Sequence, residues 1–304
     1  MKVTVTGATG TIGRALVAAL LGRGDEVTAL SRDAGRIREA LGDEVEALEW
    51  REPQREPAPQ AALAGREGVV HLLGEPIAQR WNDATKRAIR ASRELGTKNL
   101  VAGLKTATPR PSVLVSQSAT GWYGPRGEER VDETAPAGED FLAGITVAWE
   151  REAGVARELG LRVALTRTGV VLSQDGGALE QMLPPFKLGV GGPVAGGRQY
   201  VPWVHLDDVV GALVFALDNA AADGPINVTA PEPVTNKELS KALGRVLRRP
   251  ALAPVPAFAL KLLYGEMATI VLTGQRAVPT RLSELGYAFR RPELEPALRD
   301  LLKD

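Results

Sequence analysis

The apolar residues at the start of the chain change from a continuous run to a helical spacing. Residues 1–5 form a short apolar run, which predicts a strand. A turn with three glycines follows, at Gly7, Gly10 and Gly13. The next apolar residues recur at the spacing of one helix face: Ile12, Ala15, Leu16, Ala19 and Leu20. Strand, glycine turn and helix in this order form the context that a dinucleotide-binding fingerprint requires.

Each glycine of this turn has a separate physical use in such a fingerprint. Gly7 allows a tight reversal, Gly10 leaves room for a pyrophosphate against the backbone, and Gly13 lets the helix pack closely on the strand. Free amides at the start of the helix then face an anion, so we expect further cofactor contacts at Thr9, Thr11 and Ile12. The spacing differs from G-x-G-x-x-G, and the alternative is a glycine turn in another kind of α/β protein.

Apolar strands alternate with helical patterns through the first half of the chain. Further strands are predicted at 26–30, 68–74, 112–116 and 161–167, with a long charged helix from Trp81 to Leu104. This alternation predicts an α/β fold, a Rossmann-type doubly wound parallel sheet with helices on both faces. After residue 170 the pattern becomes rich in loops and predicts a smaller C-terminal α/β domain. We therefore expect a nucleotide-binding domain at 1–170, to which 203–228 return, and a small substrate domain at 171–202 and 229–304.

Composition narrows the function classes. Acidic and basic residues balance at 37 each in a chain of 304 residues, so the charge predicts neither a nucleic-acid nor a membrane partner. No apolar run has transmembrane length, and the first residues form a strand rather than a signal peptide, so we expect a cytoplasmic protein. The chain has no cysteine and only two histidines, so we predict no metal site. We expect a small molecule as its partner.

The end of the second strand bears on the choice of cofactor. An NAD site usually has Asp or Glu here for the ribose hydroxyl, whereas arginine accommodates a 2′-phosphate. Ser31 and Arg32 stand at this point, so we predict that they bind NADP(H). The alternative is that Arg32 is solvated and Asp33 binds the ribose. His71 lies within an apolar strand, and we interpret it as a packed core residue rather than a catalytic one.

Several motifs together resemble those of the extended short-chain dehydrogenase/reductases. The fingerprint reads Thr6-Gly7-Ala8-Thr9-Gly10-Thr11-Ile12-Gly13, the strand at 68–74 ends in Leu72-Leu73-Gly74, and the next helix has Gly96-Thr97-Lys98-Asn99-Leu100. Two later motifs match as well: Ser118-Ala119-Thr120-Gly121-Trp122-Tyr123-Gly124 and Trp203-Val204-His205-Leu206-Asp207-Asp208. The chain is most similar to the SDR39U-type subgroup of the epimerase family, which has a C-terminal domain of unknown function. It shares with that subgroup Gly74-Glu75-Pro76-Ile77, Leu183-Pro184-Pro185-Phe186-Lys187 and Pro254-Val255-Pro256.

This resemblance implies further binding residues. Arg93 would reach a phosphate or hold the loop 72–74 against it, and a plain surface position for Arg93 is the alternative. Backbone groups would line the nucleotide at Leu72, Leu73, Gly74 and Val171. A substrate pocket over the nicotinamide would use Glu75, Lys187, Gln199, Trp203 and His205. Extended family members often pair through two helices, so the resemblance allows a homodimer.

The resemblance breaks at the catalytic pair. The superfamily uses a tyrosine with a lysine four residues later, but no Tyr-x-x-x-Lys occurs here, and the corresponding helix at 141–150 is apolar at both positions. Tyr123 and Ser118 are our candidates for proton transfer, with a packing role for Tyr123 as the alternative. Two hypotheses stay open. The chain is an NADP(H)-dependent oxidoreductase or nucleotide-sugar epimerase-like enzyme, or it is an inactive NADP(H)-binding sensor or scaffold.

Overall fold

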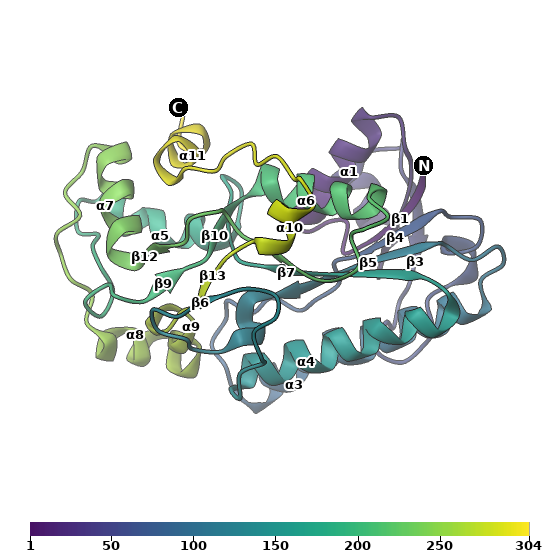
Figure 1. The fold of residues 1–304 in the computed structure, drawn as a ribbon, viewed down its shortest axis with the longest axis horizontal. Helices are drawn as coiled ribbons and strands as arrows, with labels where there is room; N and C mark the ends of the chain where they lie inside the picture. The colour runs from purple at the N-terminus through teal and green to yellow at the C-terminus, as the bar shows by residue number, and fades with distance from the viewer. Residues whose placement is uncertain (304) are drawn as a thin grey trace.

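Seven parallel strands form one central sheet in the computed structural model, which describes residues 1–303 (Figure 1). Their order is β11-β7-β5-β4-β1-β2-β3, so the chain winds outward in both directions from β1. The strands are β1 (Lys2–Thr6), β2 (Glu26–Ser31), β3 (Glu46–Glu49), β4 (Gly68–His71), β5 (Val113–Ala119), β7 (Arg162–Thr168) and β11 (Gly224–Val228). This confirms the predicted doubly wound α/β fold. The strand order reverses between β1 and β4, where such sheets form a ligand-binding crevice at their carboxyl edge.

Helices cover both faces of the sheet (Figure 1). One face carries α1 (Thr11–Gly22), α2 (Ala34–Leu41) and α6 (Leu206–Asp218), and the other carries α3 (Asp83–Thr106) and α4 (Phe141–Gly154). Strand side chains alternate between the two cores. Along β5, Val113 and Val115 join the core under α1 and α6, whereas Leu114 joins the core under α3. The apolar runs of the sequence are therefore strands that are buried on both faces.

Two details differ from or sharpen the sequence interpretation. The fourth strand ends at His71, so residues 72–74 leave the sheet and form a loop beside the glycine turn. The imidazole of His71 is fully buried, with Nδ1 2.8 Å from the Thr6 hydroxyl and Nε2 3.0 Å from the Thr97 hydroxyl. Burial lowers the pKa of His71 to about 3, because the charged ring would lose its hydration. His71 is therefore a neutral core residue, as we interpreted it.

The remaining elements form a smaller part beyond the carboxyl edge of the sheet (Figure 1). Its helices are α5 (Gly177–Lys187), α7 (Asn236–Leu247), α8 (Ala257–Tyr264), α9 (Thr269–Leu272) and α11 (Leu294–Leu301), whereas α10 (Thr280–Glu284) packs on β11 and its Leu282 joins the core under α1 and α6. Three short strand pairs support it: β8 (Val170–Leu172) with β10 (Trp203–His205), β9 (Tyr200–Val201) with β12 (Val234–Thr235), and β6 (Arg130–Val131) with β13 (Arg276–Ala277). Single 3-10 turns lie at Gln60–Ala62 (η1), Thr120–Tyr123 (η2), Val155–Leu159 (η3) and Gly265–Ala268 (η4).

The segment 203–228 contributes both to the main sheet with its helices and to the smaller part. Its strand β10 pairs with β8 outside the main sheet, but α6 packs on α1 and β11 completes the edge of the main sheet beside β7. Within residues 1–303, no helix combines the length and the hydrophobicity needed to cross a lipid bilayer.

Candidate functional site

In the glycine turn between β1 and α1, two glycines are required by close packing and the third is not. Gly7 has φ +67°, and a Cβ atom there would lie 2.7 Å from the carbonyl oxygen of Leu72. A Cβ at Gly13 would collide with the carbonyl oxygen of Gly7. Gly10 differs, because its φ of −77° suits any residue and a Cβ would meet only the Gly7 oxygen, at 3.4 Å. The fold therefore requires Gly7 and Gly13, whereas the open space at Gly10 is available to a ligand.

The start of α1 is built to receive an anion. Gly10 is its N-cap residue and offers no side-chain cap, and the first turn carries no acidic residue. The backbone N–H groups of this turn thus keep their capacity to donate hydrogen bonds, and the helix dipole adds partial positive charge. A phosphate group is the ligand that this geometry favours.

A cavity of about 230 Å³ opens beside this turn. It reaches across the switch point of the sheet, from α1 to the loop after β4, to β5 and to α4. Its lining residues are Gly7, Gly10, Thr11, Ile12, Gly13, Leu72, Gly74, Glu75, Pro76, Arg93, Gln117 and Trp149. Of the predicted cofactor residues, Thr9, Ser31, Arg32, Leu73 and Val171 are not part of this lining.

Arg93 brings a buried positive charge to the cavity. Its side chain comes from α3 and is buried, and its guanidinium donates hydrogen bonds to the carbonyl oxygens of Glu75 (3.0 Å) and Ile89 (3.2 Å). The guanidinium also lies 5.1 Å from the ring centre of Trp149 and packs against Gly74. No carboxylate within residues 1–303 forms an ion pair with it. Burial lowers the pKa of Arg93 to about 10, so the group still carries its charge at neutral pH. The surface alternative for Arg93 is wrong.

Three lining residues were not predicted as site residues: Pro76, Gln117 and Trp149. Trp149 lies on α4, and its buried indole N–H has no acceptor within the described chain. Gln117 stands on β5 among buried residues and reaches the same cavity. A polar residue inside an apolar strand was the available signal for Gln117. Nothing in the sequence distinguished Trp149 from other apolar residues of its helix.

The residues after β2 place an exposed arginine, Arg32, beside a carboxylate that caps the next helix. The carboxylate of Asp33 accepts hydrogen bonds from the backbone N–H groups of Gly35 (2.8 Å) and Arg36 (3.4 Å), and it thereby caps α2. This use competes with the alternative in which Asp33 binds a ribose. Arg32 is exposed and has no ion-pair partner among residues 1–303. The free cation beside a committed carboxylate favours a 2′-phosphate over a ribose hydroxyl.

Tyr123 lies in a buried network rather than at the cavity. Its hydroxyl donates to Asn227 Oδ1 (2.7 Å) and accepts from Arg167 Nη1 (3.1 Å), and the residue is fully buried. Burial raises the pKa of Tyr123 to about 12, which opposes use of the phenolate at neutral pH. The position therefore contradicts the predicted proton-transfer role and favours the packing alternative.

Ser118 belongs to the same network. Its hydroxyl donates to Glu150 Oε1 (2.6 Å), and Glu150 accepts two further hydrogen bonds from Arg167, at 2.8 and 2.9 Å. All three side chains are buried. This ion pair joins α4 to β7, with Ser118 on the intervening strand β5, so the hydroxyl of Ser118 is committed to holding the sheet and α4 together. Its predicted role in catalysis has no support from this geometry.

Of the five predicted substrate-pocket residues, only Glu75 lines the cavity. Lys187 is exposed at the end of α5. Gln199 donates to the carbonyl oxygens of Val194 (3.2 Å) and Val271 (2.7 Å). Trp203 is fully buried in the core of the smaller part, where its indole N–H donates to the Glu232 carbonyl at 3.0 Å. Trp203 is therefore a core residue, because β10 buries both of its faces between α6 and α7.

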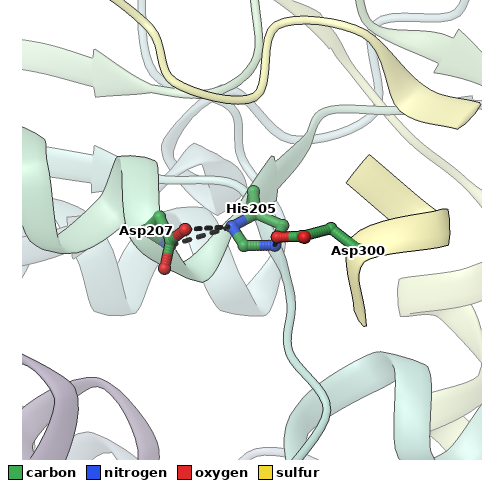
Figure 2. Close-up of side chains that lie close together, drawn as sticks. All are labelled: His205, Asp207 and Asp300. Atoms are coloured by element: carbon green, nitrogen blue, oxygen red, sulfur yellow. Dashed lines mark hydrogen bonds and ion pairs between the residues drawn. The ribbon is translucent and has the colours of Figure 1, made fainter. Parts of the chain in front are cut away.

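His205 forms part of an ion-pair cluster at the start of α6 (Figure 2). Its Nδ1 accepts a hydrogen bond from the backbone N–H of Asp207 (3.0 Å), and its Nε2 lies 3.9 Å from Asp300 Oδ2. Arg291 Nη2 lies 2.7 Å from the same Asp300 oxygen and 3.8 Å from Asp207 Oδ2. Burial lowers the pKa of His205, so the ring is neutral. The guanidinium already supplies the cation between the two carboxylates, and the cluster ties α6 to α11.

Comparison with known proteins decides the family. The model of the NAD dependent epimerase/dehydratase family matches residues 3–229, and a domain of unknown function, DUF1731, matches residues 255–301. This chain belongs to the NAD dependent epimerase/dehydratase family. The first match spans the main sheet, and the second covers the C-terminal helices from α8 to α11.

Several relatives of this epimerase-family chain carry the SDR39U1 name, which confirms the resemblance to that subgroup. The epimerase family protein SDR39U1 homolog, chloroplastic, of Arabidopsis thaliana is 40% identical over 312 residues, covering 100% of this chain and 87% of that protein. The mouse epimerase family protein SDR39U1 is 37% identical over 308 residues, covering 99% and 100%.

Solved structures share the fold of this epimerase-family chain. The crystal structure of human epimerase family protein SDR39U1 (isoform 2) with NADPH matches with a TM-score of 0.88 at 32% identity, covering 100% of both chains. UDP-glucuronic acid 4-epimerase from Bacillus cereus matches with a TM-score of 0.78 at 17% identity, covering 99% of this chain and 98% of that one. The second likeness shows a shared fold and nothing of the reaction.

Proposed function

We propose that this epimerase-family chain binds NADP(H) across the switch point of its sheet. Three observations support the proposal: the open space at Gly10, the uncapped start of α1, and the free Arg32 beside the committed Asp33. A relative that covers the whole chain was crystallised with NADPH. The pyrophosphate would lie at the start of α1, and the 2′-phosphate would lie at Ser31 and Arg32.

We further propose that the chain is an oxidoreductase acting on a small carbonyl or hydroxyl compound. The observation that carries this proposal is the buried charge of Arg93, which forms no ion pair within residues 1–303, on the cavity wall beside Glu75. These two residues lie on the β4–β5 side of the switch point, opposite the 2′-phosphate subsite at β2, where the nicotinamide half of a dinucleotide belongs. Bound NADP(H) would supply or accept a hydride there.

The chain's own residues then supply charge and a proton. The guanidinium of Arg93 would stabilise negative charge on a ligand oxygen, which is worth more inside a partly enclosed cavity than in water. Glu75 carries the one carboxyl group among the residues that line the cavity, so we assign the transferable proton to it in place of Tyr123.

Variants of α3 test the assignment of Arg93 to the ligand site, with a matched control on the same helix. Arg93→Ala should weaken NADPH binding by roughly 10- to 100-fold in a fluorescence titration, the scale of one lost charge-assisted hydrogen bond. Arg90→Ala, an exposed arginine one turn earlier on the same helix, should leave the affinity unchanged. Equal affinities for both variants would remove Arg93 from the cofactor site.

The proton assignment is tested by turnover. NADPH absorbance is followed with a panel of carbonyl and hydroxyl compounds, including nucleotide sugars, and the active compound is then given to Glu75→Gln. A loss of roughly 100-fold in kcat with unchanged NADPH affinity would support the role of Glu75. A rate equal to that of the parent would refute it.

A second candidate function is an NADP(H)-binding sensor or scaffold without turnover. It is favoured by the position of Tyr123 and Ser118, whose hydroxyls are both committed to buried partners. A parent protein that binds NADPH tightly but oxidises none of it with any compound of the panel would support this candidate. The expected homodimer and the expected cytoplasmic location stay predictions, and the Arabidopsis relative is named chloroplastic.

A further inference from the structure

Large apolar side chains are exposed on two segments of the smaller part, around the end of α5 and around α8. The helix α8 has no buried residue, and Phe258, Leu262 and Leu263 on it are 74%, 76% and 64% exposed. Leu252, before α8, is 83% exposed, and Leu188, after α5, is 78% exposed. Soluble proteins rarely leave so many large apolar side chains in water unless the surface has a partner.

The two segments that carry these residues are joined. Val194 pairs with Val255 in an isolated bridge, and the backbone N–H of Val255 donates to the carbonyl oxygen of Pro193 at 2.9 Å. Pro250 packs beside Gly189. In Figure 1 the connection from α7 to α8 runs down the left edge of the molecule, opposite the N-terminus. We name this surface the apolar end; it consists of Leu188, Val190, Leu252, Phe258, Leu262 and Leu263.

The two chain segments that carry the apolar end are basic. Residues 181–206 and 239–265 contain seven basic residues and no aspartate or glutamate, although the whole chain is balanced at 37 of each sign. Six of these basic residues are exposed and form no ion pair among residues 1–303: Lys187, Arg198, Lys241, Arg248, Arg249 and Lys261. We expected no membrane partner from the balanced net charge of the chain, but the basic residues are concentrated in these two segments.

We propose that the apolar end docks peripherally on anionic phospholipid bilayers. Apolar side chains among lysine and arginine match the boundary between acyl chains and anionic headgroups. A second copy of the chain fits less well, because a two-fold interface brings the same basic surface of both copies together. With no helix in the described chain able to span a bilayer, the contact is a surface contact. This proposal is independent of the cofactor site.

Vesicle co-sedimentation tests the proposal with the full chain. The parent should bind vesicles that contain phosphatidylglycerol, bind pure phosphatidylcholine much more weakly, and dissociate as salt is raised. The double variant Phe258→Ser/Leu262→Ser should lose at least about tenfold in binding. Arg248→Glu/Arg249→Glu should lose at least about 25-fold, since each basic residue near the surface is worth about fivefold.

A matched control lies on α2, at the opposite end. Arg36→Glu/Arg38→Glu changes two exposed arginines by the same charge and should bind anionic vesicles nearly as well as the parent. Thermal unfolding checks that every variant is folded. Failure of the parent to bind anionic vesicles, or equal losses in the α2 control, would overturn the proposal. Light scattering adds one more refuting result: a dimer that Phe258→Ser/Leu262→Ser converts to monomer would make the apolar end a self-association surface.

Discussion

Replacing Gly10 by alanine separates ligand binding from folding within one turn. The backbone of Gly10 lies in an ordinary extended conformation, with φ −77° and ψ 171°, and the added methyl group would meet only the Gly7 oxygen at 3.4 Å. Alanine is a poorer N-cap than glycine, so the free energy of unfolding should fall by no more than about 1 kcal/mol. The same methyl group would occupy the cavity where the pyrophosphate approaches the backbone.

The expected loss of affinity follows from the contacts at the start of α1. Moving the pyrophosphate away by the size of a methyl group should cost at least one hydrogen bond between a backbone N–H and a charged oxygen, about 1.5–3 kcal/mol. Gly10→Ala should therefore weaken NADPH binding by roughly 10- to 150-fold. Isothermal titration calorimetry measures the affinity, and urea unfolding measures the stability.

Two further glycines provide the controls. Gly22→Ala places the same methyl group at the far end of α1, with no atom within 4 Å, so affinity should be unchanged. Gly7→Ala combines φ +67° with an approach of 2.7 Å to the Leu72 oxygen, and it should cost about 1–3 kcal/mol of stability. A folded Gly10→Ala protein whose affinity stays within about threefold of the parent would refute the placement of the pyrophosphate.

Four other predictions rest on the same structure. Arg32→Ala should reduce the preference for NADPH over NADH by about tenfold or more in competition titrations, whereas Arg36→Ala should not, and an unchanged preference would remove the 2′-phosphate subsite. Because the folded pKa of His71 is about 3 and its unfolded pKa is near 6.5, the unfolded state takes up a proton first as pH falls below 6.5. Stability should then fall by about 1.4 kcal/mol per pH unit, and a folded His71→Gln protein with the same slope would contradict this cause. Glu150→Gln leaves Arg167 buried without its counter-charge, and it should lower the free energy of unfolding by about 3–5 kcal/mol in a denaturant titration. Tyr123→Phe should keep full NADPH affinity, and a loss of affinity in this variant would return Tyr123 to the cofactor site.

The sequence by itself determined the features that depend on neighbouring residues. Strand period, helical spacing and the order of the glycine turn follow from interactions within a few residues, so the sheet, α1 and the roles of Gly7, Gly10 and Gly13 could be predicted. The end of β2 belongs to this group as well, because Ser31 and Arg32 follow directly from the strand that presents them.

The tertiary structure alone decided which polar groups face the cavity. Tyr123 meets Asn227, which is 104 residues later in the chain, and this contact turns a candidate acid into a buried donor. Arg93 gains its position from Gly74 and Trp149, which come from a loop and a different helix. Burial, desolvation and the pairing of charges depend on such long-range contacts. The identity of a residue and the pattern around it cannot reveal them, because the same side chain is a surface group, a core group or a binding group according to what the fold brings beside it.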